Sequence, residues 1–261
     1  MMEKLDKAFN LLKLEQQYTS IKNAVDLTKE YGKPYEELEK KSQRWVHNPF
    51  SYYDIERAVK KIRDDVLGIA IGELSKEIPN VKIDEEKIRK EVEEKLGEIG
   101  FSVSLTKEII DRDYVSKAEE LSREEILTQA QHLLPVIWVE GVHKQLEPKD
   151  ILDGRKLLLE VAISDYGFRG EHDYRFNEDR EIISAFDKVC GLIAYPKTTY
   201  TKIQDSSLTL QLINIREPFY DIIVDDRHIE KVRVYKNRKF IVVFDNEENA
   251  KKVAERLLEK V

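Results

Sequence analysis

Apolar residues in the first half of the chain recur at spacings of three and four, the pattern of one face of an α-helix. The first stripe consists of Leu11, Leu14, Tyr18, Ile21 and Val25. We expect its helix to end at Gly32 and Pro34, because proline lacks the backbone N–H that would continue it. A second stripe, which Ser51 should open and Pro79 should end, consists of Ile55, Val59, Ile62, Val66 and Ile69. Each stripe lasts about two heptads, which favours a helical bundle over a long coiled coil.

Capping residues predict two more helices in this half. Asp84 should cap a helix that runs to about Leu96 and is closed by Gly97 and Gly100. Ser122 and Glu125 have the spacing of a capping box for a helix that runs towards Leu146, with a kink or break at Pro135. Between these helices, the stretch Phe101–Leu105 fits either a short strand or a loop.

The second half changes to short apolar runs that are separated by turn-forming residues. We expect a strand at Lys156–Ile163, and then a helix that Asn177 caps. The later runs that we expect to be strands are Thr198–Ile203, Leu208–Ile215, Tyr220–Val224, Ile229–Tyr235 and Lys239–Phe244. Asp245 with Glu248 should cap a final helix through Leu258.

These elements predict an α+β fold: an N-terminal helical region followed by an antiparallel β-meander with flanking helices. Closely spaced strands favour antiparallel pairing, because parallel pairs need long crossovers. The change of period near 147–155 is the best boundary, which gives a helical region at 1–147 and an α+β antiparallel-sheet domain at 148–261. A single α+β domain with a helical lobe is the alternative.

The composition adds limits on environment and chemistry. Charged residues make up 36% of the chain, against about 25% in a typical domain. With two methionines and one cysteine, this resembles the ion-pair-rich composition of thermophile proteins, although a mesophilic helical protein is the alternative. The lone Cys190 excludes an intrachain disulfide and a multi-thiolate zinc site. The longest apolar runs are far shorter than the about 20 residues of a membrane span. We therefore expect a soluble, cytoplasmic protein with no membrane contact.

The sharpest local feature is a basic segment at 227–239. It nets +5, whereas the rest of the chain nets −12. In the strand at Ile229–Tyr235, alternation should place the cations and Tyr235 on one face and the valines on the other. Cations beside an aromatic side chain suit a nucleic-acid backbone with a stacked base. The candidate binding residues are Arg227, Lys231, Arg233, Tyr235, Lys236, Arg238 and Lys239. A solvated outer face is the alternative interpretation.

Acidic residues around the strand at 156–163 form a second candidate site. Carboxylates at a strand end can hold Mg²⁺ for phosphodiester hydrolysis. Nucleases of the restriction-endonuclease-like class place an acidic residue before a strand with Glu-x-Lys, but here the strand has Glu160-Val-Ala162 and lacks the lysine. We therefore assign no catalytic residue, no metal site and no cofactor. The residues in question are Asp150, Asp153, Glu160, Asp165, Glu171, His172 and Asp173.

Two other clusters have structural alternatives. Trp45, Phe50, Tyr52 and Tyr53 gather around a helix start, where they fit either inter-helix packing or an exposed interface. Glu140 and His143 are three residues apart on the helix expected there, but a di-iron bundle needs this pair twice. We therefore interpret Glu140 and His143 as structural residues.

Three functions remain open on this basis. The first is a non-enzymatic binding or assembly protein that contacts nucleic acid or another polyanion, or an acidic protein, through the basic hairpin. The second is a protein-interaction or structural subunit, in a homo-oligomer or a larger complex. The third is a metal-dependent hydrolase that uses the 150–173 carboxylates. The net charge of −7 fits the second at least as well as the first, because dedicated nucleic-acid binders are usually basic overall.

Overall fold

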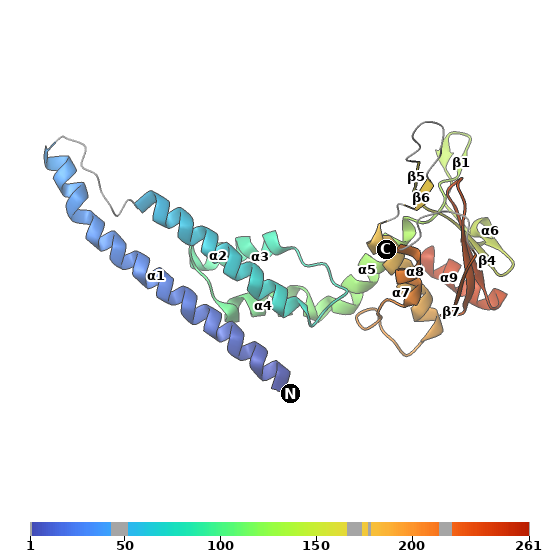
Figure 1. The fold of residues 1–261 in the computed structure, drawn as a ribbon, viewed down its shortest axis with the longest axis horizontal. Coiled ribbons are helices and arrows are strands. Elements are labelled where there is room, and N and C mark those ends of the chain that lie inside the picture. Colours follow the sequence, from blue (N-terminus) through green and yellow to red (C-terminus); the bar gives the residue numbers. More distant parts are fainter. Residues whose placement is uncertain (1, 43–51, 166–173, 177–178, 214–220, 261) are drawn as a thin grey trace. The chain divides into compact units, whose positions relative to one another are not determined.

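The computed structural model describes residues 2–42, 52–165, 174–176, 179–213 and 221–260 (Figure 1). The chain divides into two compact units, Met1–Pro79 with Ile83–Lys117 and Asn80–Lys82 with Ala118–Val261. The fold class is α+β, as the sequence predicts. The units divide at 117/118, upstream of the 147–155 segment where the sequence pattern changes. None of the described helices is both long and apolar enough to cross a membrane.

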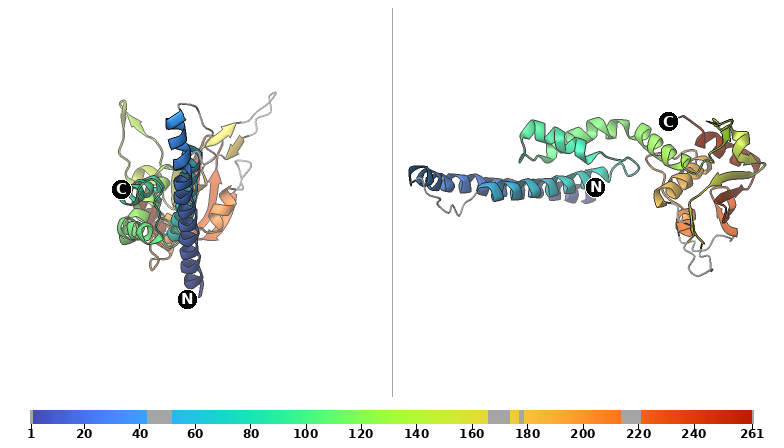
Figure 2. Two further views of the ribbon diagram at one scale, coloured as in Figure 1. Left: turned by 90° about the vertical axis from the view of Figure 1, so that its left-hand side faces the viewer. Right: turned by 90° about the horizontal axis from the view of Figure 1, so that it is seen from above.

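All the described secondary-structure elements of the first unit are helices. Its elements are α1 (Met2–Ser42), α2 (Tyr52–Ser75), α3 (Glu85–Leu96), α4 (Val103–Asp113) and the 3-10 turn η1 (Val115–Lys117). Helices α1 and α2 lie side by side and run in opposite directions (Figure 2). Their seam is built from Leu11, Tyr18 and Val25 on α1, which are seven residues apart and buried. Tyr18 and Val25 pack in a core with Val59 and Val66, so these parts of the two predicted stripes face each other.

The prediction that Gly32 and Pro34 end the first helix is wrong, because α1 continues to Ser42. Gly32 is buried seven residues after Val25, and so it continues the seam inside the helix. Pro34 is exposed, and Glu30, whose carbonyl loses its N–H partner, is exposed as well. Water can satisfy that carbonyl, which lowers the cost of an interior proline. The expected opening of the second helix at Ser51 lies outside the described residues.

Helix α3 has the predicted ends. The Asp84 carboxylate accepts a bond from the backbone N–H of Lys87 at 3.0 Å. Gly97 ends the helix with φ 80, a left-handed conformation that favours glycine. The prediction of a strand or loop at Phe101–Leu105 is wrong, because Ser102 caps α4 there and its hydroxyl accepts from the N–H of Leu105.

The second unit is an antiparallel sheet with helices on one face (Figure 1). The strand order is β3-β4-β9-β8-β7, with β7, β8 and β9 forming the predicted meander. Two separate hairpins, β1-β2 and β5-β6, accompany it. The strands are β1 (Trp138–Val139), β2 (Val142–His143), β3 (Leu152–Asp153), β4 (Lys156–Glu160), β5 (Ile163–Asp165), β6 (Tyr174–Phe176), β7 (Asp221–Asp226), β8 (Ile229–Val234) and β9 (Lys239–Phe244). The helices are α5 (Ala118–Gln131), α6 (Pro148–Ile151), α7 (Arg180–Ala194), α8 (Ser207–Ile213) and α9 (Glu247–Leu257).

One face of the sheet forms the core of this unit. Its register aligns Leu157 with Val242 and Leu159 with Phe240 across β4 and β9. These side chains are buried against α5, α7, α8 and α9, and the Phe186 ring of α7 meets the Phe240 ring edge-on at 5.9 Å. The core therefore fixes which face of β8 and β9 points away from the helices.

The predicted helix from Ser122 towards Leu146 is wrong at both ends. Helix α5 begins at Ala118, so Ser122 lies inside it with a buried hydroxyl that has no hydrogen-bond partner among the described residues. The helix ends at Gln131, ahead of Pro135, and the β1-β2 hairpin follows. Glu140 and Gly141 form its two-residue turn with φ values of 51 and 82, the geometry that matches strand twist.

Two of the expected strands are absent from the described chain. Thr198–Ile203 forms turns, and Leu208–Ile213 belongs to helix α8. Leu208 and Leu212, which are one helical turn apart, are buried, whereas Leu210 is 58% exposed. Burial therefore follows the helical period, although the sequence alternates. Residues 214–215 of that expected strand lie outside the described part.

The N-caps of α7 and α9 are residues close to the ones predicted. Asn177 lies outside the described residues, and Asp179 is the N-cap of α7. Asn246, not Asp245, caps α9, because its side-chain oxygen accepts from the N–H of Asn249 at 2.8 Å. The final helix itself is present as predicted, through Leu257.

Replacement of a helical glycine by alanine should have opposite effects on stability at Gly72 and at Gly191. Alanine at Gly191 would bring its Cβ within 2.8 Å of Arg227 Cζ and of Ile203 Cδ1, whereas Gly72 has no atom within 4 Å. Gly72→Ala should raise the free energy of unfolding by about 0.5–1 kcal/mol through helix propensity. Gly191→Ala should lower it by about 1–3 kcal/mol, because overpacking outweighs that gain. Denaturant titration by circular dichroism measures both, and stabilisation by Gly191→Ala would contradict the packing described.

Candidate functional site

The turn between β8 and β9, with the first residue of β9, carries three of the six predicted cations. Lys236, Arg238 and Lys239 are exposed. The backbone N–H of Tyr235 donates to the Lys239 carbonyl at 2.9 Å, and that of Arg238 donates to the Tyr235 carbonyl at 3.0 Å. Arg238 has φ 70, a left-handed conformation that is uncommon outside glycine and asparagine. The turn is therefore defined by its hydrogen bonds and holds Lys236 and Arg238, and Lys239 follows as the first residue of β9.

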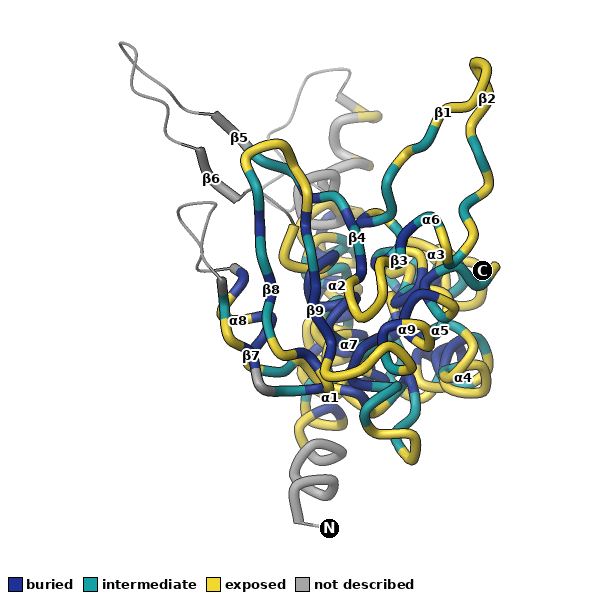
Figure 3. The backbone as a smooth tube through the Cα atoms, turned by 90° about the vertical axis from the view of Figure 1, so that its right-hand side faces the viewer, coloured by how far each residue is buried: buried dark blue, intermediate teal, exposed yellow. Residues whose placement is uncertain are grey.

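The adjoining strand β8 shows the predicted alternation. Val232 and Val234 are buried, whereas Lys231 and Arg233 lie on the opposite face of the sheet and are half-buried. Figure 3 looks onto this face, with α7 and α9 behind the strands. Arg233 Nη1 donates to the Tyr235 hydroxyl at 3.0 Å, and its Cζ lies 5.8 Å from the ring centroid. Lys231, Arg233 and Lys236 also interact with other parts of the chain.

The acidic residue of the segment lies away from the turn. Glu230 is near the start of β8, where its carboxylate accepts from Arg155 at 2.7 Å. Lys239 aligns with Glu160 of β4 across the sheet. The Arg238 carbonyl accepts from the Val161 N–H at 3.0 Å, and its Nε donates to the Val161 carbonyl at 3.3 Å. These bonds fix the basic turn beside the end of β4.

Arg227 does not join this surface. It forms the turn between β7 and β8 with His228, and their φ values are 53 and 64. Its side chain is buried, and Nη1 pairs with Asp187 Oδ1 of α7 at 2.7 Å. Nη2 donates to the Gln204 carbonyl at 2.5 Å. Arg227 therefore contributes to the core of the unit, where an anionic ligand has no access to it.

Asp187, which the sequence does not single out, is the centre of this buried network. It is fully buried, and its carboxylate accepts from the Ser206 N–H at 2.6 Å and the Thr209 hydroxyl at 2.6 Å. These bonds join α7 to the start of α8. Burial, reinforced by the charge of Asp187, raises the pKa of the Cys190 thiol well above its usual value. Cys190 is thus a buried thiol without nucleophilic character at neutral pH.

The β1-β2 hairpin carries an exposed aromatic pair that sequence reasoning missed. The Trp138 and His143 rings lie with their centroids 3.7 Å apart. The interpretation of Glu140 and His143 as neighbours on a helix is wrong, because Glu140 is in the turn and His143 is in β2. The missed signal is the run of β-branched and aromatic residues on either side of Glu140-Gly141.

The acidic residues of the hydrolase hypothesis do not converge in the described part. Asp150 pairs with Lys144 at 2.5 Å and also accepts from the Glu147 N–H at 2.9 Å. The bond from Lys144 holds the pKa of Asp150 below its usual value. Asp153 pairs with Lys156 at 3.3 Å. No group of three or more metal-ligating side chains gathers among the described residues. Glu160 lies on β4 and aligns with Lys239 of β9. The other candidates, Glu171, His172, Asp173 and the side chain of Asp165, lie outside the described part.

The predicted aromatic interface is also outside the described part of the chain. Trp45 and Phe50 precede α2, and Tyr52 and Tyr53 begin it, but their side chains are not among those described. The proposal that this cluster forms an interface therefore remains a prediction.

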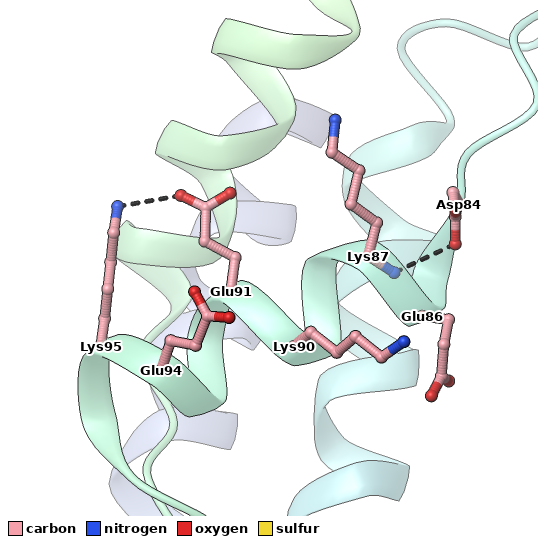
Figure 4. A pocket seen from close by; sticks show the side chains of 7 residues that line it. All are labelled: Asp84, Glu86, Lys87, Lys90, Glu91, Glu94 and Lys95. Carbon is pink, nitrogen blue, oxygen red and sulfur yellow. Dashed lines mark hydrogen bonds and ion pairs between the residues drawn. The ribbon is translucent and has the colours of Figure 1, made fainter.

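An open hollow of about 500 Å³ lies along α3 in the first unit (Figure 4). Its walls are charged side chains of both signs, Asp84, Glu86, Lys87, Lys90, Glu91, Glu94 and Lys95. Glu91 belongs to an ion-pair network, in which Arg112 of α4 donates two bonds to its carboxylate at 2.9 and 2.7 Å. Lys95 lies 3.0 Å from the same carboxylate. The residues that line the hollow are all charged, four acidic and three basic, so its net charge is small.

This network predicts a pH-dependent contribution to stability. The bonds from Arg112 and then Lys95 lower the pKa of Glu91 to about 2. Because the pKa of Glu91 is lower in the fold than in the unfolded chain, where it is near 4.5, the ionised carboxylate stabilises the folded state at pH values above 4.5. This stabilisation is lost as the pH falls towards 2. Glu91→Gln should lower the free energy of unfolding by about 1 kcal/mol at pH 7, and by less at pH 3. The exposed Glu94 of α3 (Figure 4) is the control, because Glu94→Gln removes a charge but none of these bonds. An equal loss at both pH values would contradict the ionic origin.

Comparison with models of protein families, with curated proteins and with solved structures finds no match for this chain.

Proposed function

We propose that this protein is a non-enzymatic binding protein that contacts an anionic polymer, nucleic acid in particular, with the turn between β8 and β9. The observation that carries the proposal is the presence of three exposed cations at one hydrogen-bonded turn, Lys236 and Arg238 within it and Lys239 at the start of β9. Phosphate groups bind such clusters because each contact releases condensed counterions. The turn is already ordered, so binding costs little conformational entropy.

The surroundings of the turn support a polymer over a small anion. Lys231 and Arg233 are further cations on β8, on the face of the sheet opposite to the buried Val232 and Val234. Glu230 pairs with Arg155 near the far end of that strand. A chain of phosphates can follow such a line of cations, whereas a single phosphate contacts only one end.

The test is binding of wild-type protein to labelled oligonucleotides and to inorganic polyphosphate at low salt. Fluorescence anisotropy should show binding that weakens steeply as salt rises, because counterion release drives it. Absence of binding to single-stranded DNA, RNA and polyphosphate at low salt would overturn the proposal.

A second candidate is a protein-interaction subunit, which the surface of α1 favours. Leu12, Leu27 and Tyr31 are 57%, 55% and 65% exposed on this helix, although α2 covers its other side. Exposed apolar side chains on a long helix are typical of helix-to-helix association. Light scattering at micromolar concentration tests the homo-oligomer form of this candidate, and a monomer would exclude it.

A further inference from the structure

The β1-β2 hairpin exposes more apolar surface than its own fold needs. Val136, Trp138, Val139 and Val142 are 58%, 59%, 51% and 67% exposed. The hairpin extends away from the sheet (Figure 3). A two-stranded hairpin gains little stability by itself, so exposed apolar residues there indicate a contact surface.

The indole of Trp138 is held in place for such a contact. Its ring lies against that of His143 on the paired strand, and the backbone register places these two residues opposite each other. More than half of the Trp138 surface nevertheless remains exposed. An aromatic ring that is already oriented can stack on a base at a low entropic cost.

The hairpin and the basic turn adjoin the same end of β4. The Glu160 N–H donates to the Leu133 carbonyl at 2.8 Å, and the Val161 N–H donates to the Arg238 carbonyl at 3.0 Å. Trp138 follows Leu133 by five residues, a reach of at most about 18 Å for an extended chain. In Figure 3 both features project from the same end of the sheet. One extended ligand can therefore contact both.

We propose that Trp138 stacks on an unpaired base of single-stranded nucleic acid whose phosphates lie on the basic turn. This inference rests on the proposed function and names its ligand class. Duplex DNA fits less well, because its bases are already stacked on one another inside the helix. A protein groove would cover the valines but would not use the positive charge beside them, whereas a single strand uses both surfaces.

The reporter for this inference is the fluorescence of Trp138 itself. The chain has two tryptophans, so Trp45→Phe leaves Trp138 as the sole tryptophan, and selective excitation separates its emission from that of the tyrosines. Titration with a dT oligonucleotide should quench this emission, because the indole stacks on a base. Polyphosphate, which carries the charges without bases, should bind without quenching. Binding of polyphosphate with no quenching by the oligonucleotide would overturn the stacking inference and leave the proposed function standing. If neither the oligonucleotide nor polyphosphate bound, both the stacking inference and the proposed function would be wrong.

Substitutions of the hairpin give the second readout. Trp138→Ala should weaken binding to the dT oligonucleotide by about tenfold and leave binding to polyphosphate unchanged. Trp138→Phe should retain most of the affinity, because an aromatic face remains. Val136→Ala is the matched control, since it removes exposed apolar surface from the same segment without removing a ring. If Trp138→Ala lowers self-association in light scattering and leaves oligonucleotide affinity intact, the hairpin docks on protein and the inference is wrong.

Discussion

Replacement of Asp187 by alanine is expected to lower the free energy of unfolding by about 3–5 kcal/mol. The carboxylate is fully buried and lies 2.7 Å from the guanidinium of Arg227, which is itself buried. Its removal would leave the Arg227 charge in the core without a partner. The Ser206 N–H and the Thr209 hydroxyl would lose their acceptor as well. Denaturant titration measures the effect, and a loss below about 1 kcal/mol would contradict an uncompensated buried charge.

A double variant distinguishes the cost of an unpaired charge from the value of the pair. Asp187→Leu with Arg227→Met removes both charges, and well-packed apolar residues often replace a buried ion pair with little loss. We expect the double variant to be more stable than Asp187→Leu alone. Glu181→Ala, at an exposed position of the same helix, controls for a general effect of substitution in α7. If the double variant were no more stable than Asp187→Leu alone, the loss would come from the hydrogen bonds to α8.

The sequence predicts those parts of the fold that depend on nearby residues. The heptad spacing of Leu11, Tyr18 and Val25 predicts the seam of α1, because helical neighbours alone determine which face is apolar. The Asp84 cap of α3 is equally local. In β8 the alternation of Val232 and Val234 with charged residues predicts which face is buried.

Helix α8 shows where local pattern fails. Leu208, Leu210 and Leu212 alternate with polar residues, which is the period of a strand. Asp187 lies about twenty residues earlier and supplies the acceptor for the start of the helix. Leu208 and Leu212 then pack inward, and Leu210 points to solvent at 58% exposure. A tertiary contact thus overrides the local preference.

In the candidate site, too, the sequence predicts what depends on nearby residues and fails where a distant residue decides. The turn cations Lys236, Arg238 and Lys239 are exposed because a hairpin turn lies outside the sheet core, and turn chemistry is visible in sequence. Arg227 belongs to the same charge run, but its environment depends on Asp187, which is forty residues away. Charge patterning cannot show that a cation has a buried partner on another element.

Reversal of the three turn cations is expected to abolish binding to anionic polymers. Lys236→Glu, Arg238→Glu and Lys239→Glu together would replace attraction to phosphate by repulsion on the turn that the proposed function uses. The fold should persist, because these side chains are exposed and the turn is held by backbone bonds. Column retention and anisotropy measure the loss, with circular dichroism as the check on folding.

A matched variant separates local charge from net charge. Reversing Lys197, Lys251 and Lys252, which are exposed elsewhere in the second unit, changes the net charge by the same amount. It should leave most of the binding intact, because the contact is local. Neutralising the turn cations to glutamine should reduce the slope of log affinity against log salt by about 2, since each cation contributes about 0.7 on a single strand. Equal losses from both reversals would show that only overall charge matters, and the turn would then not be the binding site.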